Sequence, residues 1–155
     1  MTRSKPSRPT NRERGQSLTE FALIAPMFLV LVFGIIDFGM GLNGWITITN
    51  AAREGARLGA VYAEAGTTGT SSSPVSCSTI SESDNSTIAG RSCHTADSLP
   101  RANVTVGVDG ALGSTGESVK VKMTYDYQFV TPLGSFISGL VGPIHMETET
   151  DMRLE

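Results

Sequence analysis

The sequence has 155 residues, which is room for one domain and its two ends, and it is 39% hydrophobic and 17% charged. Its net charge of −3 combines two unlike regions. Residues 1–15 hold five basic residues against one acidic residue, whereas residues 51–155 hold seven against twelve. This asymmetry is typical of a chain that meets a membrane. It argues against a nucleic-acid surface, since no aromatic residue is interleaved with the arginines.

The basic head is rich in Pro, Ser and Thr and is expected to be disordered by itself. After it comes an apolar run, Phe21–Ile36, without a charged residue. Counted on through Asp37 to Ile48, the segment would be about 42 Å long as a helix, enough to cross a bilayer. We therefore predict a single membrane helix with its basic end in the cytoplasm and its body outside.

Two other interpretations of this segment are weaker. A cleaved secretory signal should end in small residues, but Asp37 and Phe38 stand there. A buried core helix is disfavoured because 28 residues with one charge are too apolar for so small a domain. The helical pattern continues beyond Ile48, and we predict one helix over residues 16–64.

Small residues recur every four positions in the later part of this helix and so share one face: Ala51, Gly55, Gly59 and Ala63. A face without bulky side chains lets another backbone approach closely. The sequence leaves open whether that backbone belongs to the chain's own sheet or to a neighbouring subunit.

Residues 65–101 are rich in Ser, Thr and Gly and show no clear period, so a long loop is expected. It contains the two cysteines, Cys77 and Cys93. Zinc would need closer Cys or His pairs. A disulfide in an exported domain is the favoured reading, and two free thiols are the alternative.

The last section, residues 102–155, alternates polar and apolar residues as antiparallel strands do. The clearest stretches are 103–108 and 118–130, and 145–154 alternates more weakly. The segment 133–141 between them is apolar and broken by Gly. The expected fold class is therefore α+β, a long N-terminal transmembrane helix followed by a small antiparallel sheet.

The chemistry is concentrated just before the apolar run, in Arg14-Gly15-Gln16-Ser17-Leu18-Thr19-Glu20-Phe21. A basic head, a Gly, four non-acidic residues, a Glu and then a membrane helix resemble the processing site of type IV pilins and pseudopilins. The resemblance implies that a prepilin peptidase removes residues 1–15 by cutting between Gly15 and Gln16. Glu20, beside Phe21, would then set the registry between subunits by pairing with a neighbour's new α-amino group. Capping of the helix start is the alternative role of Glu20.

The segment 15–63 is similar to the TadE-like family of the tight-adherence (Tad) pilus system. The shared features are Gly15, Glu20-Phe21, Pro26, the Ile35–Gly39 stretch and the Ala51–Arg57 block. Members of this family are minor pilins or pseudopilins. The expected partners are therefore the prepilin peptidase, other pilins, the Tad inner-membrane assembly proteins and the lipid bilayer.

Asp37 interrupts the apolar segment, and a carboxylate there should face protein or a wet cavity. Arg53 is too far along a straight helix to reach it. We expect a partner from a second subunit or another membrane component, unless Asp37 lies at the outer boundary without one.

No enzymatic function is expected, since hydrolase and nucleotide-binding motifs are missing from the sequence and no cofactor is called for. The main rival function is a single-pass membrane protein whose outer domain binds a ligand and has no role in a pilus.

Overall fold

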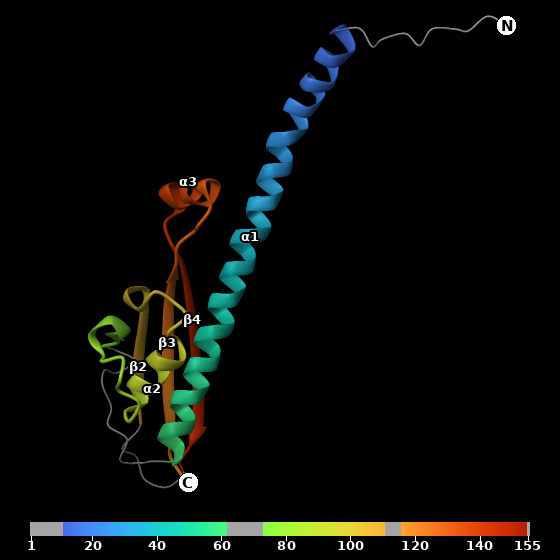
Figure 1. Ribbon diagram of the computed structural model, residues 1–155. Helices are drawn as coiled ribbons and strands as arrows, with labels where there is room; N and C mark the ends of the chain where they lie inside the picture. Colours follow the sequence, from blue (N-terminus) through green and yellow to red (C-terminus); the bar gives the residue numbers. More distant parts are fainter. Residues whose placement is uncertain (1–10, 62–72, 111–115, 155) are drawn as a thin grey trace, which may run out of the picture.

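The structure is a computed structural model that describes residues 11–61, 73–110 and 116–154. One long helix lies against a small antiparallel sheet and continues well past its end (Figure 1). The elements in chain order are α1 (Asn11–Val61), β1 (Val75–Ser76), the 3-10 turn η1 (Cys77–Thr79), α2 (Ile88–Thr95), the 3-10 turn η2 (Arg101–Asn103), β2 (Val104–Asp109), β3 (Ser118–Tyr127), α3 (Pro132–Val141) and β4 (Ile144–Arg153). The predicted α+β class is confirmed.

The sheet has the order β1-β2-β3-β4, and all its neighbours are antiparallel. Its central strand β3 alternates strictly, with every second side chain buried from Val119 to Tyr127. Those side chains form one face that packs on α1, while Lys120 and Lys122 lie on the other face opposite acidic residues of β4. The period of two in the sequence therefore marks the face that builds the core.

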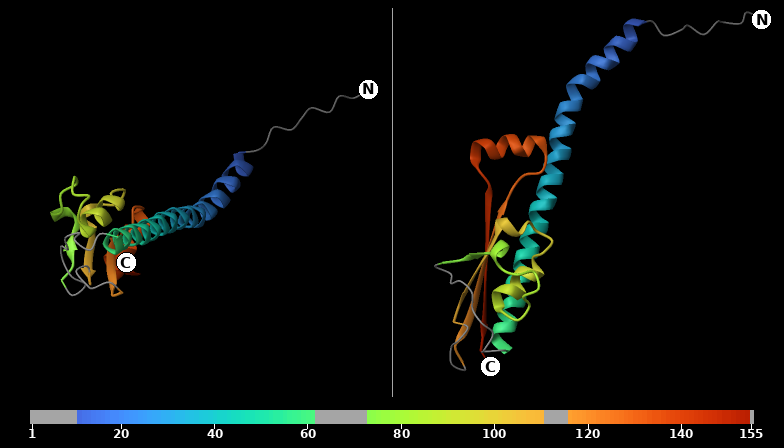
Figure 2. Two further views of the ribbon diagram at one scale, coloured as in Figure 1. Left: turned by 90° about the horizontal axis from the view of Figure 1, so that it is seen from below. Right: turned by 60° about the vertical axis from the view of Figure 1, so that its left-hand side comes forward.

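Helix α1 has two parts with different surroundings. From Asp37 onward it buries residues at intervals of one to four, namely Asp37, Gly41, Gly44, Ile48, Ala51, Ala52, Gly55, Ala56 and Gly59. Between Gly15 and Ile36 nearly every side chain is exposed, and the helix projects beyond the rest of the molecule (Figure 2). Small residues dominate the packed part because a helix without bulk can lie close to a sheet.

The expectation of a long loop over residues 65–101 is wrong for its described part. β1 adds a strand to the sheet, and α2 buries Ile88, Ala89 and Cys93 against the core. Thr87 caps this helix by accepting a hydrogen bond from the N–H of Gly90 at 3.0 Å. A helix of eight residues is too short to show a clear period, and here tertiary packing rather than propensity holds it.

The apolar segment 133–141 forms a helix, α3, which joins β3 to β4 at the end of the sheet beside the middle of α1 (Figures 1 and 2). Thr131 caps it by accepting from the N–H of Gly134, and Pro132 stands at its first turn, where a missing N–H costs nothing. The two glycines inside the segment obscured this helix in the sequence.

Candidate functional site

Gly15, Gln16, Glu20 and Phe21 all lie on the exposed N-terminal part of α1. The amide Nε2 of Gln16 donates to the Oε1 of Glu20 at 3.3 Å, which places the two side chains on one face of the helix. Phe21 is 68% exposed. These residues are therefore presented to the surroundings rather than used to hold the domain together.

Glycine is not needed at position 15 for packing. A Cβ there would have no atom within 4 Å, whereas at Gly59 it would lie 2.8 Å from the Cδ1 of Ile88. A glycine within a helix is destabilising by roughly 0.5–1 kcal/mol relative to alanine. Since no contact in the described structure compensates for this at Gly15, the reason for the glycine lies outside the fold of the domain.

Asp37 is bonded within its own chain, which corrects the expectation of a partner from a second subunit or another membrane protein. Its Oδ1 accepts from the backbone N–H groups of Val130 and Thr131 at 3.1 and 3.2 Å. Its Oδ2 accepts from the hydroxyl of Thr131. The hydroxyl of Tyr127 donates to the Asp37 carbonyl at 3.0 Å.

The approach of this carboxylate also depends on Gly134 in the first turn of α3. A Cβ on Gly134 would lie 2.5 Å from the Oδ2 of Asp37 and 2.5 Å from the Cβ of Phe129. Asp37 is 6% exposed, so donors from the turn before α3 replace water around a buried charge. Sequence reasoning missed this pairing because the partners lie more than ninety positions away. The one local signal in the sequence was Thr131-Pro132, a pair typical of the start of a helix.

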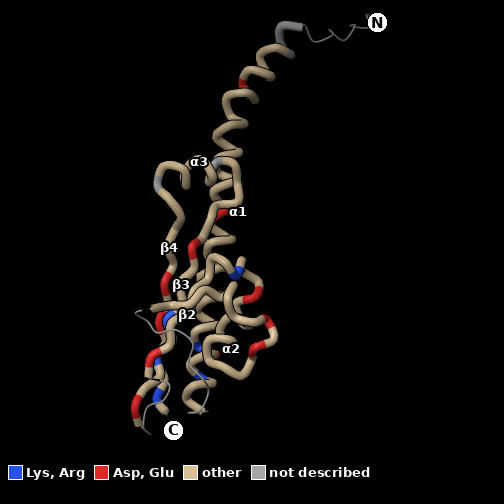
Figure 3. The backbone as a smooth tube through the Cα atoms, turned by 90° about the vertical axis from the view of Figure 1, so that its left-hand side faces the viewer, with Lys and Arg blue, Asp and Glu red and all other residues tan. Residues whose placement is uncertain are grey.

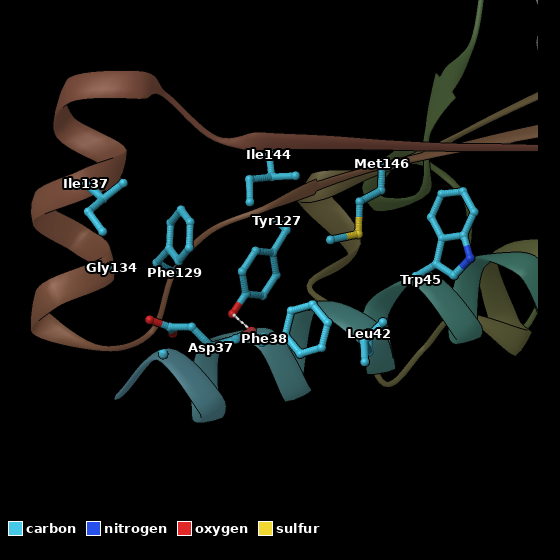
Figure 4. Close-up of a pocket in the computed structure, with 12 residues that line it drawn as sticks. Asp37, Phe38, Leu42, Trp45, Tyr127, Phe129, Gly134, Ile137, Ile144 and Met146 are labelled. Carbon is cyan, nitrogen blue, oxygen red and sulfur yellow. Dashed lines mark hydrogen bonds between the residues drawn. The ribbon is translucent and has the colours of Figure 1, made fainter. Parts of the chain in front are cut away.

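An apolar cavity of about 420 Å³ lies beside Asp37, between α1 and the α3–β4 side of the molecule. Figure 4 shows aromatic and aliphatic side chains around it from α1, α3, β4 and the end of β3. They include Phe38 and Trp45 of α1, Phe129 next to β3 and Ile144 of β4. Asp37 is the one ionisable carboxylate at its edge among the described lining residues. The cavity is suited to an apolar occupant rather than to acid–base chemistry.

The stripe of small residues is turned towards the chain's own domain. A Cβ on Gly55 would lie 2.0 Å from the Oγ of Ser92 in α2, and one on Gly59 would lie 3.0 Å from a methyl of Val119 in β3. Ala51 is fully buried in the same core. Of the two possibilities left open by the sequence, the structure places the domain on this face. Ala63 lies outside the described residues.

The family model described as TadE-like protein matches residues 15–57. Over this segment the chain is similar to TadE-like proteins. The match confirms the resemblance drawn from the same residues and suggests a membrane protein associated with the Tad pilus. No curated protein and no solved structure matches the chain.

The TadE-like segment contains Gly15, Glu20, Asp37 and the start of the small-residue stripe, while α2, α3 and the sheet lie outside it. Within the described part of the chain, α1 from Gly15 to Val61 is the one helix long and apolar enough to cross a membrane. Only 6% of its most apolar stretch is buried, whereas a helix in the core of a soluble protein would be mostly buried. The segment is thus compatible with a single-pass anchor.

Two links tie α2 to the rest of the domain. Cys77 and Cys93 form a disulfide with an S–S distance of 1.94 Å, and both are buried. Glu54, on α1 beyond the apolar segment, accepts from the guanidinium of Arg91 at 2.8 Å. Hydrogen bonds from Arg57 and Arg91 lower the pKa of Glu54 to about 2, so its charge persists at any physiological pH.

No group of three or more His, Cys, Asp or Glu residues in the described ranges could hold a metal ion. The two histidines lie apart, with His94 on α2 and His145 on β4. His145 contacts Asp126 of β3 at 2.6 Å, on the exposed side of the sheet.

Proposed function

We propose that the protein is a minor pilin, or pseudopilin, that is processed between Gly15 and Gln16 and takes part in assembling a Tad-type adhesive pilus. One observation carries this proposal. The TadE-like segment begins on an exposed stretch of α1. From Gly15 up to Asp37, Glu20 is the one acidic residue. A body of roughly ninety residues after the helix favours a minor over an abundant subunit.

Processing would create a cation that could pair with Glu20. A carboxylate at the edge of hydrocarbon costs several kcal/mol unless it is paired. Cleavage after Gly15 leaves an α-amino group on Gln16, with a pKa near 7.7–8.0 and hence a positive charge at neutral pH. Since the side chain of Glu20 is exposed in the single chain, it is available to the amine of a neighbouring processed subunit. Phe21 would pack beside this ion pair.

The proposal also includes the orientation of the protein in the membrane and its partners. The basic head favours a cytoplasmic N-terminus and an extracytoplasmic domain. The partners would be the prepilin peptidase, other pilins and the Tad inner-membrane proteins. We assign no catalytic role, cofactor or nucleic acid to the protein.

Substitutions at Glu20 test the proposal. We expect Glu20→Ala to abolish incorporation into pili, or co-purification with other pilins, while cleavage and membrane insertion persist. Glu20→Gln keeps the size and polarity of the side chain but removes its charge. If Glu20 forms an ion pair, this variant fails nearly as badly as alanine.

Thr19→Ala is the matched control. It removes the hydrogen bond from the Thr19 hydroxyl to the Gln16 carbonyl, at 2.7 Å, without changing a charge. It should assemble normally. Normal assembly of Glu20→Ala would contradict the proposed role of Glu20, and tolerance of glutamine alone would assign it to capping instead.

A further inference from the structure

Helix α3 presents a large apolar surface that nothing in the described structure covers. Phe136 is 70% exposed, Leu140 is 75% exposed and Ile137 is 42% exposed. Residues 127–144, which include α3 and both its connections, contain no charged residue. Figure 3 shows Lys, Arg, Asp and Glu on the strands, around α2 and on α1, and none on α3. Apolar surfaces of this kind in water usually mark an interaction site.

The position of α3 along α1 indicates what covers it. Asp37 bonds to the turn that starts α3, and the ring of Tyr127 lies 3.9 Å from where a Cβ on Gly41 would be. Gly41 comes twenty-one positions after Glu20 in the sequence. At ~1.5 Å per residue this is about 32 Å, close to the ~30 Å thickness of the hydrocarbon core of a bilayer.

The nearest charges on the sheet mark the same level. Tyr127 is opposite Ile144, and the next pair in the register is Asp126 and His145, which contact each other on the exposed side. On the sheet, charged residues thus begin one residue pair beyond Tyr127 and Ile144. On α1 the segment after Asp37 stays free of charge past this level, as far as Ala52. α3 lies on the apolar side of that height, level with the last turns of the apolar segment.

The cavity of about 420 Å³ lies at this level too. Its wall is apolar on the α1 side, at Phe38 and Leu42, and on the opposite side, at Ile137 and Met146. Water in such a space would find few hydrogen-bond partners. An acyl chain would remove the same surface from water without needing any.

We propose that α3 is a second membrane contact, immersed in the leaflet on the domain's side, with lipid acyl chains filling the space between α3 and α1. Lipid is favoured over a protein partner because the exposed face of α3 is level with the exposed apolar surface of α1, which is itself suited to lipid. The proposal requires α1 to be in a bilayer, and it goes beyond a role in a pilus, on which it does not depend.

Tryptophan fluorescence in the full chain tests the proposal. In a Trp45→Phe background, which leaves no other tryptophan, Phe136→Trp places a probe on α3. Leu29→Trp reports on insertion of α1, and His94→Trp, on the exposed side of α2, is the aqueous control. Each variant is reconstituted in phosphatidylcholine nanodiscs without bromine, with bromine near the headgroup end of the acyl chains, or with bromine near their methyl end, and is also titrated with aqueous iodide.

We expect brominated lipid to reduce the emission of Phe136→Trp about twofold or more, as for a side chain 5–10 Å below the headgroup boundary. Iodide should quench it little, and the His94→Trp control should behave in the opposite way. Quenching of Phe136→Trp by iodide but not by bromine would overturn the proposal.

Protection of Phe136→Trp from both quenchers would overturn it as well, and would assign α3 to a protein contact such as a second copy. If Leu29→Trp escapes bromine, the membrane anchor itself fails, and α3 has no bilayer to enter. If brominated lipid quenches Phe136→Trp as expected but the Glu20 experiments contradict a role in a pilus, the lipid contact stands and only the proposed function is rejected.

Discussion

At the scale of single residues, α1 carries glycines in two opposite environments. Gly15, Gly34 and Gly39 have no atom near the position of a Cβ, whereas Gly55 and Gly59 would clash with α2 and β3. The second group has a structural reason, because close packing of a helix on a domain needs small residues. The first group has no such reason within the described structure. A recognition role for Gly15 is therefore a functional rather than a structural hypothesis.

A pair of alanine substitutions separates these environments. Gly55→Ala should destabilise the domain by about 1–2 kcal/mol, because a clash with the buried Ser92 hydroxyl outweighs the gain in helix propensity. Gly39→Ala, the matched control, should leave stability unchanged or raise it slightly. Urea unfolding of the full chain in detergent micelles measures both. Equal stability of the two variants would contradict the packing described for Gly55.

Asp37 is the other residue whose role depends on remote contacts. Asp37→Ala removes the acceptor for the N–H groups of Val130 and Thr131, so we expect the α3 connection to be destabilised locally by about 1–3 kcal/mol. Hydrogen exchange at these two amides should become faster. Asp126→Ala is the control, because its exposed pairing with His145 is worth little. Unchanged exchange in Asp37→Ala would show that the carboxylate does not hold this turn.

At the scale of elements, the sequence was most informative where one physical constraint acts along a whole segment. The charge-free run and the strict period of two over 118–127 predicted α1 and β3, since a bilayer and a half-buried strand constrain each successive residue. α2 and α3 are short, and their stability comes from contacts with distant parts of the chain. The Ser, Thr and Gly content around α2 predicted a loop there, and the glycines within α3 weakened its helical pattern in the sequence.

The disulfide that joins η1 to α2 gives the prediction at this scale. Protein taken from its native host should resist thiol alkylation unless a reductant is added, since Cys77 and Cys93 are bonded and buried. Opening a loop of this length by reduction should destabilise the domain by about 3 kcal/mol. Alkylation of both cysteines without reductant would rule out the bridge in the native protein.

At the scale of the whole molecule, one helix serves two surroundings. Its second part holds the sheet, and its first part projects as an exposed apolar rod that starts with Gly15 and Glu20 (Figure 1). A domain that was only anchored to a membrane would need the apolar rod but not Gly15 and Glu20 at its start. We propose that the spacing of Gly15 from Glu20 serves cleavage between Gly15 and Gln16, after which the new end meets another subunit.

The mass of the mature protein tests that claim most directly. In a host with an active prepilin peptidase, mass spectrometry of the purified protein should find Gln16 as the first residue. Gly15→Leu should leave the full-length precursor in the membrane. Gly39→Leu, a substitution at an equally open glycine of the same helix, should be processed normally. A native protein that still begins near Met1 would contradict the account, and would leave a membrane-anchored domain with no pilin chemistry.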